Sequence, residues 1–261
     1  MIESLHSPHV ARVKALIGSK GAKERREQGL FVAEGVQCAR EALTSKNGPE
    51  LKILYATESG LAKISELDTN SVEIVEVTDA VMKAMSDTVT PQGLISLCYK
   101  PESDFASLTS AGSSIFIYLH EIQDPGNAGT ILRTADAMGI SAVITSPDSV
   151  DMFSPKVVRS TAGSLWHLPV FEGISFQRVA QQFPDISTFL LSSHAKKSIT
   201  DLTIQGDCIA IFGNEARGVD ASTLGASVTE VTIPMAGRAE SLNLSAAASI
   251  VMFTLSSKVA G

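Results

Sequence analysis

Three short stretches in the carboxyl-terminal half of the chain place glycine, asparagine and charged residues at the ends of apolar runs. They cover residues 124–135, 211–218 and 233–247. The apolar runs predict buried strands, and ligands of open α/β sheets bind beyond the carboxyl ends of the strands. Glycine lets the backbone approach a ligand closely, and the polar side chains supply hydrogen bonds. We therefore expect the three stretches to form a pocket for a small polar cofactor.

The first stretch contains two polar side chains on a predicted helix over residues 128–138. Asn127 stands where this helix begins, which is typical of an N-cap. Arg133 lies about 200° around the helix from Ile131, so it points away from the buried face that Ile131 and Ala135 form. By themselves these two residues are compatible with a cap and a solvated cation. Arginine is also suited to phosphate, because its planar fork pairs with two phosphate oxygens.

The other two stretches end the predicted strands 208–212 and 228–233. The 213–218 turn has the glycine spacing of a P-loop but is followed by Val219 and Asp220 instead of lysine and a hydroxyl residue, and no dinucleotide-binding glycine motif follows a strand. Taken alone, these stretches are compatible with a glycine-rich turn and a tightly packed helix. The candidate cofactor-binding positions in these stretches, which a resemblance to a known family implies, are Gly213, Asn214, Gly218, Ile233, Pro234, Met235, Ser241, Leu242 and Ser245.

Length and composition indicate one large or two modest folded domains. The chain has 261 residues, of which 44% are hydrophobic, and its mean hydropathy is +0.17. No apolar run is long enough to span a membrane, and the first residues lack the pattern of a signal peptide. Cys38, Cys98 and Cys208 are far apart and form no paired motif, so we expect no metal site, no disulfide framework and a cytoplasmic location.

The net charge of −7 is unusual for a protein that binds nucleic acid, but the charge is unevenly distributed. Residues 12–26 form a basic stripe interrupted only by Glu24. Such a stripe can contact phosphates even on an acidic protein, and it can equally be a solvated helix face. The candidates for contact with a nucleic acid here are Arg12, Lys14, Lys23, Arg25 and Arg26.

A stretch rich in serine, glycine and proline at residues 100–114 predicts a linker between two domains. We expect a small α/β domain over residues 1–104, a linker at 105–114 and a second domain over 115–261. Helices are predicted at 10–17, 35–43, 78–85, 128–138, 155–163 and 244–255. Strands are predicted at 31–33, 51–55, 72–77, 93–99, 114–119, 142–145, 188–191, 208–212 and 228–233. Apolar strands alternating with helices in the second domain predict a mostly parallel sheet.

Together and in this order, the three stretches resemble the signature motifs of the SpoU (TrmH-like) branch of the SPOUT RNA methyltransferases. The resemblance implies a knotted carboxyl-terminal domain, a homodimer with the active site near its interface, and S-adenosylmethionine as the cofactor. It implies that main-chain groups of Gly213, Ile233 and Leu242 hold the adenine. The residues that the resemblance places at the catalytic and polar positions of the motifs are Asn127, Arg133, Glu215, Ser241 and Asn243.

Two further regions resemble the same family. Residues 154–169 suggest Lys156 and Arg159 as candidates for RNA contacts or for contacts across the subunit interface. The amino-terminal half resembles a substrate-recognition domain related to ribosomal proteins that bind kinked RNA. The implied reaction is metal-free methyl transfer to a ribose 2′-OH of structured RNA, with ribosomal RNA favoured over transfer RNA.

Two alternatives stay open. A SPOUT enzyme that methylates a base of transfer RNA is disfavoured by the ribose-type pattern of Asn127 and Arg133. A non-catalytic RNA-binding protein is disfavoured by the intact pocket residues, and failure to bind S-adenosylmethionine would support it. The general base has no assignment.

Overall fold

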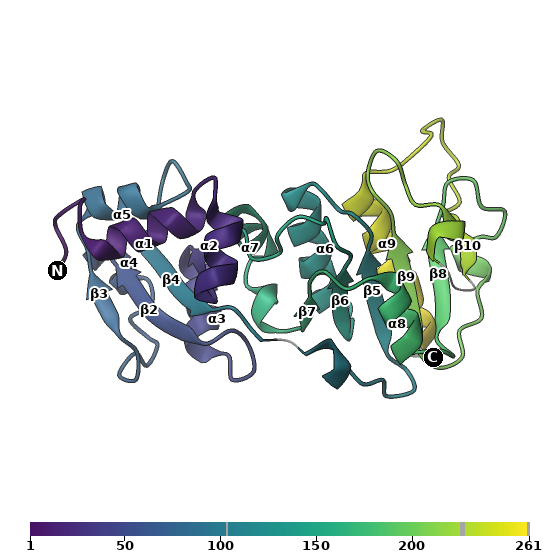
Figure 1. Ribbon diagram of the computed structural model, residues 1–261, viewed down its shortest axis with the longest axis horizontal. Coiled ribbons are helices and arrows are strands. Elements are labelled where there is room, and N and C mark those ends of the chain that lie inside the picture. The colour runs from purple at the N-terminus through teal and green to yellow at the C-terminus, as the bar shows by residue number, and fades with distance from the viewer. Residues whose placement is uncertain (103, 225–227, 260–261) are drawn as a thin grey trace. The chain divides into compact units, whose positions relative to one another are not determined.

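The computed structural model describes residues 1–102, 104–224 and 228–259. The chain divides into two compact units (Figure 1). The first unit holds Met1–Glu102 together with Asp151–His167, and the second holds the rest of the described chain. The first unit thus includes a 17-residue segment from the second half of the chain, which the sequence did not predict.

The first unit is a four-stranded sheet covered by helices on both faces. In the strand order β1-β4-β2-β3, β4 is antiparallel to its two neighbours and β3 is parallel to β2. The strands are β1 (Leu30–Glu34), β2 (Leu51–Ala56), β3 (Ile74–Glu76) and β4 (Leu94–Tyr99). The helices are α1 (Pro8–Ile17), α2 (Gly21–Gln28), α3 (Val36–Thr44), α4 (Glu58–Ala62) and α5 (Asp79–Met85).

Hydrophobic periodicity and capping explain the helices that flank this sheet. Val10, Val13 and Leu16 lie on one side of α1 and are buried in a single core with residues of α5 and of alternate positions on the strands. The opposite face of the sheet packs against α3 and α4. Thr78 accepts a hydrogen bond from the amide of Val81 and caps α5, as the sequence predicts.

The segment Asp151–His167 joins the first unit through a buried ion pair and aromatic packing. Arg25 Nη2 lies 2.8 Å from Asp151 Oδ2. The ring of Phe31 lies 5.1 Å from that of Phe153 and 6.1 Å from that of Trp166. The segment contains α7 (Pro155–Thr161), which packs against β1. These contacts explain why the segment folds with the first unit.

The second unit is a six-stranded parallel sheet with the order β10-β8-β9-β5-β6-β7. Its strands are β5 (Ile115–Leu119), β6 (Ala142–Thr145), β7 (Val170–Phe171), β8 (Ser187–Leu191), β9 (Cys208–Phe212) and β10 (Thr229–Val231). Its α-helices are α6 (Pro125–Ala137), α8 (Phe176–Gln182) and α9 (Leu244–Val259). One face of the sheet packs against α8, and α6 and α9 pack against each other and contact the strands. The predicted fold class, a mostly parallel α/β domain after a smaller α/β domain, is confirmed.

The region predicted as a linker at 105–114 is partly built into the second unit. Phe105–Ser107 form a short 3₁₀ helix, and the Phe105 ring packs 5.5 Å from that of Phe171 within the core. The serine- and glycine-rich composition predicted a linker, but Phe105 within it packs into the core of the second unit. None of the helices described is both long and apolar enough to cross a membrane.

Candidate active site

The turn after β9 requires glycine at two positions. A Cβ atom at Gly213 would lie 2.5 Å from the carbonyl carbon of Gly218, which no real side chain tolerates. Gly218 itself has a φ of +64°, in the left-handed region that favours glycine. The two glycines let the 213–218 turn fold back on itself at the carboxyl end of the strand.

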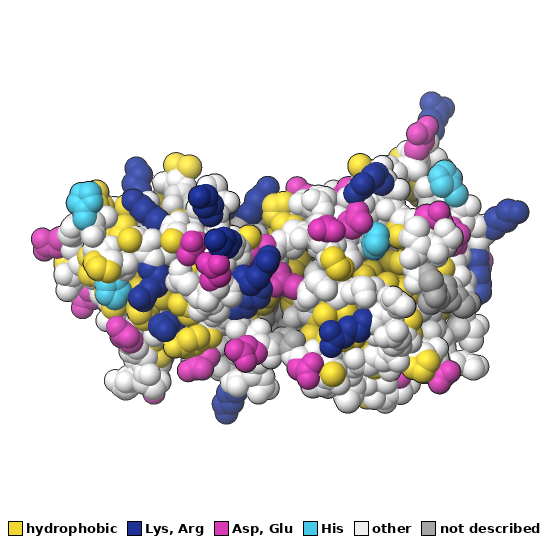
Figure 2. Space-filling model, in the orientation of Figure 1, with side chains coloured by type: hydrophobic (Ala, Val, Ile, Leu, Met, Phe, Trp, Pro, Cys, Tyr) yellow, Lys and Arg dark blue, Asp and Glu magenta, His cyan; other side chains and the backbone are white. Residues whose placement is uncertain are grey.

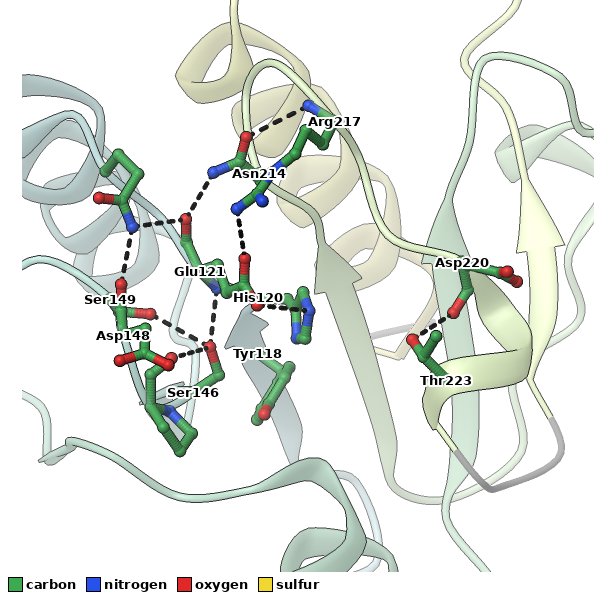
Figure 3. A network of polar contacts seen from close by, with 12 residues as sticks. Tyr118, His120, Glu121, Ser146, Asp148, Ser149, Asn214, Arg217, Asp220 and Thr223 are labelled. Atoms are coloured by element: carbon green, nitrogen blue, oxygen red, sulfur yellow. Dashed lines mark hydrogen bonds and ion pairs between the residues drawn. The ribbon is translucent and has the colours of Figure 1, made fainter.

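The side chain of Asn214 holds this turn against the loop that follows β5 (Figure 3). Its Nδ2 donates to the carbonyl oxygen of Glu121 at 2.9 Å, and its Oδ1 accepts from the amides of Ala216 at 3.0 Å and Arg217 at 3.2 Å. Asn214 is 8% exposed. The buried amide is held by these internal partners and positions the turn, and a cofactor contact of Asn214 stays a prediction.

Glu121 forms a left-handed turn at the end of β5, with a φ of +50°. Its carbonyl oxygen accepts a second hydrogen bond, from Gln123 Nε2 at 3.1 Å, and its amide donates to Ser146 Oγ at 2.7 Å. Its carboxylate lies 2.7 Å from Arg217 Nη2. Contacts from three loops therefore hold a backbone conformation that non-glycine residues seldom adopt.

The carboxylate of Glu215 lies at the start of α6. It accepts hydrogen bonds from the amides of Gln123 at 3.3 Å and Asp124 at 3.2 Å, and from Asn127 Nδ2 at 3.3 Å. The amino-terminal end of a helix favours a negative charge. Asp124 is the N-cap, accepting from the amide of Asn127 at 2.7 Å, so the expected capping role of Asn127 is wrong. The Asn127 side chain instead contacts Glu215.

Asn243 connects the third stretch to the other two. Its Nδ2 donates to Asn127 Oδ1 at 3.1 Å. Its Oδ1 accepts from the amide of Ser245 at 2.9 Å and of Ala246 at 3.3 Å, at the beginning of α9. The three stretches that the sequence singled out thus meet in a chain of hydrogen bonds from Glu215 through Asn127 to Asn243.

Two hollows lie beside this chain of hydrogen bonds. One has a volume of about 540 Å³ and the other of about 510 Å³. The residues that line both are Asn127, Asn214, Glu215, Ala216 and Asn243. The larger hollow, which we call the main cavity, is also lined by the predicted residues Gly213, Gly218, Ile233, Met235, Ser241 and Leu242. Pro234 and Ser245, which were also predicted, are not among its lining residues.

Sequence reasoning missed one wall of the main cavity, formed by Leu191, Ser192, Ser193 and His194 at the end of β8. The rule that ligands bind beyond the carboxyl ends of strands applies to β8 as it does to β9. Neither glycine nor an asparagine motif marks this wall, so no local pattern indicates it.

Arg133 is exposed on α6 and is not among the lining residues of either hollow. Its neighbour Thr134 lies 3.3 Å from Ser249 on α9. Within the described residues of one chain, therefore, the structure brings Asn127, Glu215 and Asn243 together but does not bring Arg133 into their cluster.

All seven predicted RNA-contacting residues belong to the first unit. Arg12, Lys14, Lys23, Arg26 and Lys156 are exposed. Figure 2 shows lysine and arginine side chains over α1 and α2, with acidic side chains among them.

Three of the seven have ion-pair partners. Lys23 pairs with Glu27 at 3.6 Å, and both side chains are exposed. Arg159 lies 3.1 Å from Asp87 and is partly exposed. Arg25 is 5% exposed, pairs with Asp151 and donates to the carbonyl oxygen of Leu16. The expectation of an RNA contact is wrong for Arg25, because its guanidinium is buried in the core of the unit.

The described residues near the site include no cluster of metal ligands, and the buried Tyr118 is unsuited to act as a base. The described residues contain no group of three or more histidine, cysteine or acidic side chains that could hold a metal ion. Burial raises the pKa of Tyr118 to about 12, and its hydroxyl donates to the carbonyl oxygen of Ile174 at 3.0 Å. The phenol therefore stays protonated at neutral pH and is unsuited to accept a proton.

A parallel α/β sheet with a polar cavity formed by loops at its strand ends defines a cofactor-binding enzyme domain. Residues 114–253 match the model of the SpoU rRNA Methylase family, and residues 9–96 match the MRM3-like substrate binding domain. The family match covers more than half of the chain. The chain belongs to the SpoU rRNA methylase family and is an S-adenosylmethionine-dependent RNA methyltransferase.

Individual relatives extend this similarity over nearly the whole chain. The 23S rRNA (guanosine(2553)-2′-O)-methyltransferase RlmP of Bacillus subtilis is 33% identical over 89% of this chain and 91% of its own length. An S-adenosylmethionine-bound rRNA methyltransferase from Sinorhizobium meliloti has a TM-score of 0.84 and 26% identity, covering 97% of this chain and 96% of that one. A structure described as an RNA 2′-O ribose methyltransferase has a TM-score of 0.82 and 28% identity, covering 98% of each chain.

The main cavity fits the cofactor of this family. Its volume of about 540 Å³ lies within the range of small-molecule sites, roughly 300–1,000 Å³. Its lining combines the apolar residues Ile233 and Leu242 with Gly213, which carries no side chain. This combination suits a flat heterocycle that is recognised by main-chain groups.

Proposed function

We propose that this enzyme methylates a ribose 2′-OH in ribosomal RNA. The observation that carries the proposal is the pair of hollows with a shared wall of Asn127, Glu215 and Asn243. Methyl transfer needs a cofactor and an acceptor hydroxyl on opposite sides of one reacting carbon, and two adjoining hollows meet that need. The names of the relatives, which act on 23S rRNA or on the ribose 2′-O position, support this choice of substrate.

The chain supplies alignment of the reactants. When bound in the main cavity, S-adenosylmethionine supplies an electrophilic methyl group. Glu215 and Asn243 hold the Asn127 amide from both sides, which fixes its orientation at the shared wall. Each polar atom of that amide keeps one further hydrogen-bonding position, so Asn127 can hold the ribose hydroxyl. Positioning of this kind accounts for several kcal/mol of a barrier (about 7–11 at most).

Arg133 acts, in this proposal, on a neighbouring copy of the chain. Ile250 and Phe253, three residues apart on α9, are 40% and 63% exposed, and neighbouring exposed apolar side chains on one helix face support an interface there. Since α6 packs beside α9, a homodimer formed through these residues would bury the surface near Arg133 and direct its guanidinium towards the partner's substrate. Phe253→Asp should therefore yield monomers in analytical ultracentrifugation, and a dimer that persists would contradict this interface.

The carboxyl-terminal segment forms a knot in this proposal, and the enzyme works in the cytoplasm. Support for the knot comes from the path of the chain: after β10 at one edge of the sheet, α9 returns to pack against α6. Support for the location comes from Cys38, Cys98 and Cys208, which are all buried free thiols, as is usual in a reducing compartment.

The first unit recognises the RNA in this proposal. Arg12, Lys14, Lys23 and Arg26 are exposed on α1 and α2, where they can neutralise phosphates. Lys156 and Arg159 on α7 belong to the same unit and extend this set of candidates. A charge-reversal series on these residues should weaken RNA binding and reduce its salt dependence.

Glu215→Gln tests the catalytic arrangement. The substitution keeps the size of the side chain but replaces one acceptor oxygen by a donor that faces the amide of Gln123 or of Asp124. We expect turnover to fall by about tenfold to a hundredfold. At 1.36 kcal/mol for each factor of ten, this is a rise of about 1.4–2.7 kcal/mol in the activation free energy. Cofactor affinity, measured by calorimetry, should change little. Glu230→Gln removes an exposed carboxylate on β10 and serves as the control. Equal turnover in the two variants would contradict the role assigned to Glu215.

A further inference from the structure

The main cavity is lined by very few charged groups. Among its lining residues Glu215 is the one acid, Arg217 is the one arginine, and no lysine is present. The cofactor carries two positive groups, its sulfonium and its α-ammonium, and one negative group, its α-carboxylate. A buried or half-buried carboxylate needs a cationic or strong hydrogen-bonding partner. Arg217 is the permanently charged group of the cavity that can meet this need.

The guanidinium of Arg217 is held at one point only. Its Nη2 lies 2.7 Å from Glu121 Oε2, and no other partner of the guanidinium is found in the described residues. The side chain is 72% exposed. A guanidinium has five N–H donors, so four remain for a ligand, and its planar fork matches a carboxylate.

The backbone that carries Arg217 is fixed by the loops of the site (Figure 3). The Arg217 amide donates to Asn214 Oδ1 at 3.2 Å, and the same asparagine donates to the carbonyl oxygen of Glu121. Glu121 is thereby held in its left-handed conformation, with its carboxylate directed at Arg217. A long flexible side chain that is anchored at both its base and its tip loses less entropy when it binds a ligand.

We propose that Arg217 binds the α-carboxylate of S-adenosylmethionine and that Glu121 is the positioning residue that holds the guanidinium at the rim of the cavity. The inference rests on the cavity being the cofactor site. It adds a salt bridge to the amino-acid end of the cofactor, while the Gly213, Ile233 and Leu242 side of the cavity takes the adenine. The 213–218 turn would then have two roles: it places Glu215 at the start of α6, and it places Arg217 where the cofactor carboxylate binds.

Two ligands that differ only in the carboxylate test this proposal. Titration calorimetry on the full chain would compare S-adenosylmethionine with decarboxylated S-adenosylmethionine. Arg217→Ala should weaken binding of S-adenosylmethionine by about tenfold or more, as expected for a partly exposed charge-assisted contact, and should leave the affinity of the decarboxylated ligand within about twofold. Arg238→Ala, which removes an exposed arginine that does not line the cavity, is the matched control and should change neither affinity.

Each other outcome contradicts the inference in a distinguishable way. If Arg217→Ala lowered the affinity for both ligands equally, Arg217 would only shape the turn. Unchanged cofactor affinity with weaker RNA binding would assign Arg217 to an RNA phosphate instead. If the wild-type protein bound neither ligand, the proposed function would fail together with the inference.

Discussion

The buried ion pair between Arg25 and Asp151 gives a quantitative test of how the first unit is built. Asp151 Oδ2 accepts a hydrogen bond from Arg25 Nε at 2.9 Å and lies 2.8 Å from Arg25 Nη2. The side chain of Arg25 is 6% exposed and that of Asp151 is 19% exposed. Asp151→Asn keeps the size of the side chain and the oxygen that accepts from the Phe153 amide, but it removes the charge. Arg25 would then be a buried cation without a counter-charge.

Removing one partner of a buried pair costs about 3–5 kcal/mol. Domain stabilities are roughly 5–15 kcal/mol, so the substitution should remove a large part of the stability of this unit. At a urea dependence of about 1–3 kcal/mol per molar, the unfolding midpoint should fall by more than about 1 M. The expected change is therefore well above the error of a denaturation experiment.

Trp166 supplies the assay. It is the one tryptophan of the sequence, it is 3% exposed, and it packs in the first unit with its indole N–H donating to the carbonyl oxygen of Pro49 at 3.0 Å. Its fluorescence during urea unfolding therefore reports on this unit alone. Glu27→Gln, which breaks the exposed pair between Lys23 and Glu27, is the control and should cost less than about 1 kcal/mol.

A midpoint for Asp151→Asn that matches the control would refute this reasoning, because Asp151 would then not neutralise a buried charge. The double variant Arg25→Met with Asp151→Leu separates charge from packing. Replacing a buried pair by apolar residues of similar volume is often neutral, so this variant should recover most of the lost stability.

Three further predictions concern the site, the dimer and the thiols. Asn243→Ala should lower the free energy of unfolding, measured by calorimetry, by about 1 kcal/mol, because α9 loses its cap. It should also slow single-turnover methylation while the affinity for the cofactor is retained. An unchanged rate of methylation would exclude Asn243 from the mechanism. Arg133→Ala should bind cofactor normally and lose most turnover, and mixing it with Asn243→Ala should restore activity in part, since one site of a mixed dimer then has both residues; no restoration would place Arg133 in the site of its own chain. Burial raises the pKa of Cys38 and Cys208 to about 12, so these thiols should resist alkylation at pH 8 in the native protein. The urea concentration at the unfolding midpoint should decrease when the pH is raised above about 9, because the thiols then ionise in the unfolded chain and stay protonated in the folded one. Rapid alkylation of the native protein would contradict their burial.

The sequence was most informative where structure follows from local patterns. The strands 142–145 and 208–212 were predicted with their observed bounds, because continuous apolar runs bounded by turns have few other uses in a parallel sheet. The cluster of Asn127, Glu215 and Asn243 was selected from motifs and is brought together by loops at strand ends. Its hydrogen-bond pattern could not be predicted, since the N-cap role falls to Asp124 and not to Asn127.

Long-range packing explains what the sequence did not reveal. In the sequence Arg25 is part of a basic stripe. Its burial depends on the ion pair with Asp151, which lies far along the chain and is brought to it only by the fold. The strand β7, with two residues, is too short for a periodic signal, and α8 was not predicted either. The transfer of residues 151–167 to the first unit depends on aromatic contacts with Phe31, which no local pattern encodes.

The central claim is methyl transfer to a ribose of ribosomal RNA. The most direct measurement incubates the purified chain with methyl-labelled S-adenosylmethionine and unmodified ribosomal or transfer RNA, and then maps label to alkali-resistant linkages. We expect label at one resistant linkage in ribosomal RNA, because 2′-O-methylation removes the hydroxyl that alkaline cleavage needs. Label on a base of transfer RNA, or no incorporation together with no cofactor binding, would contradict it.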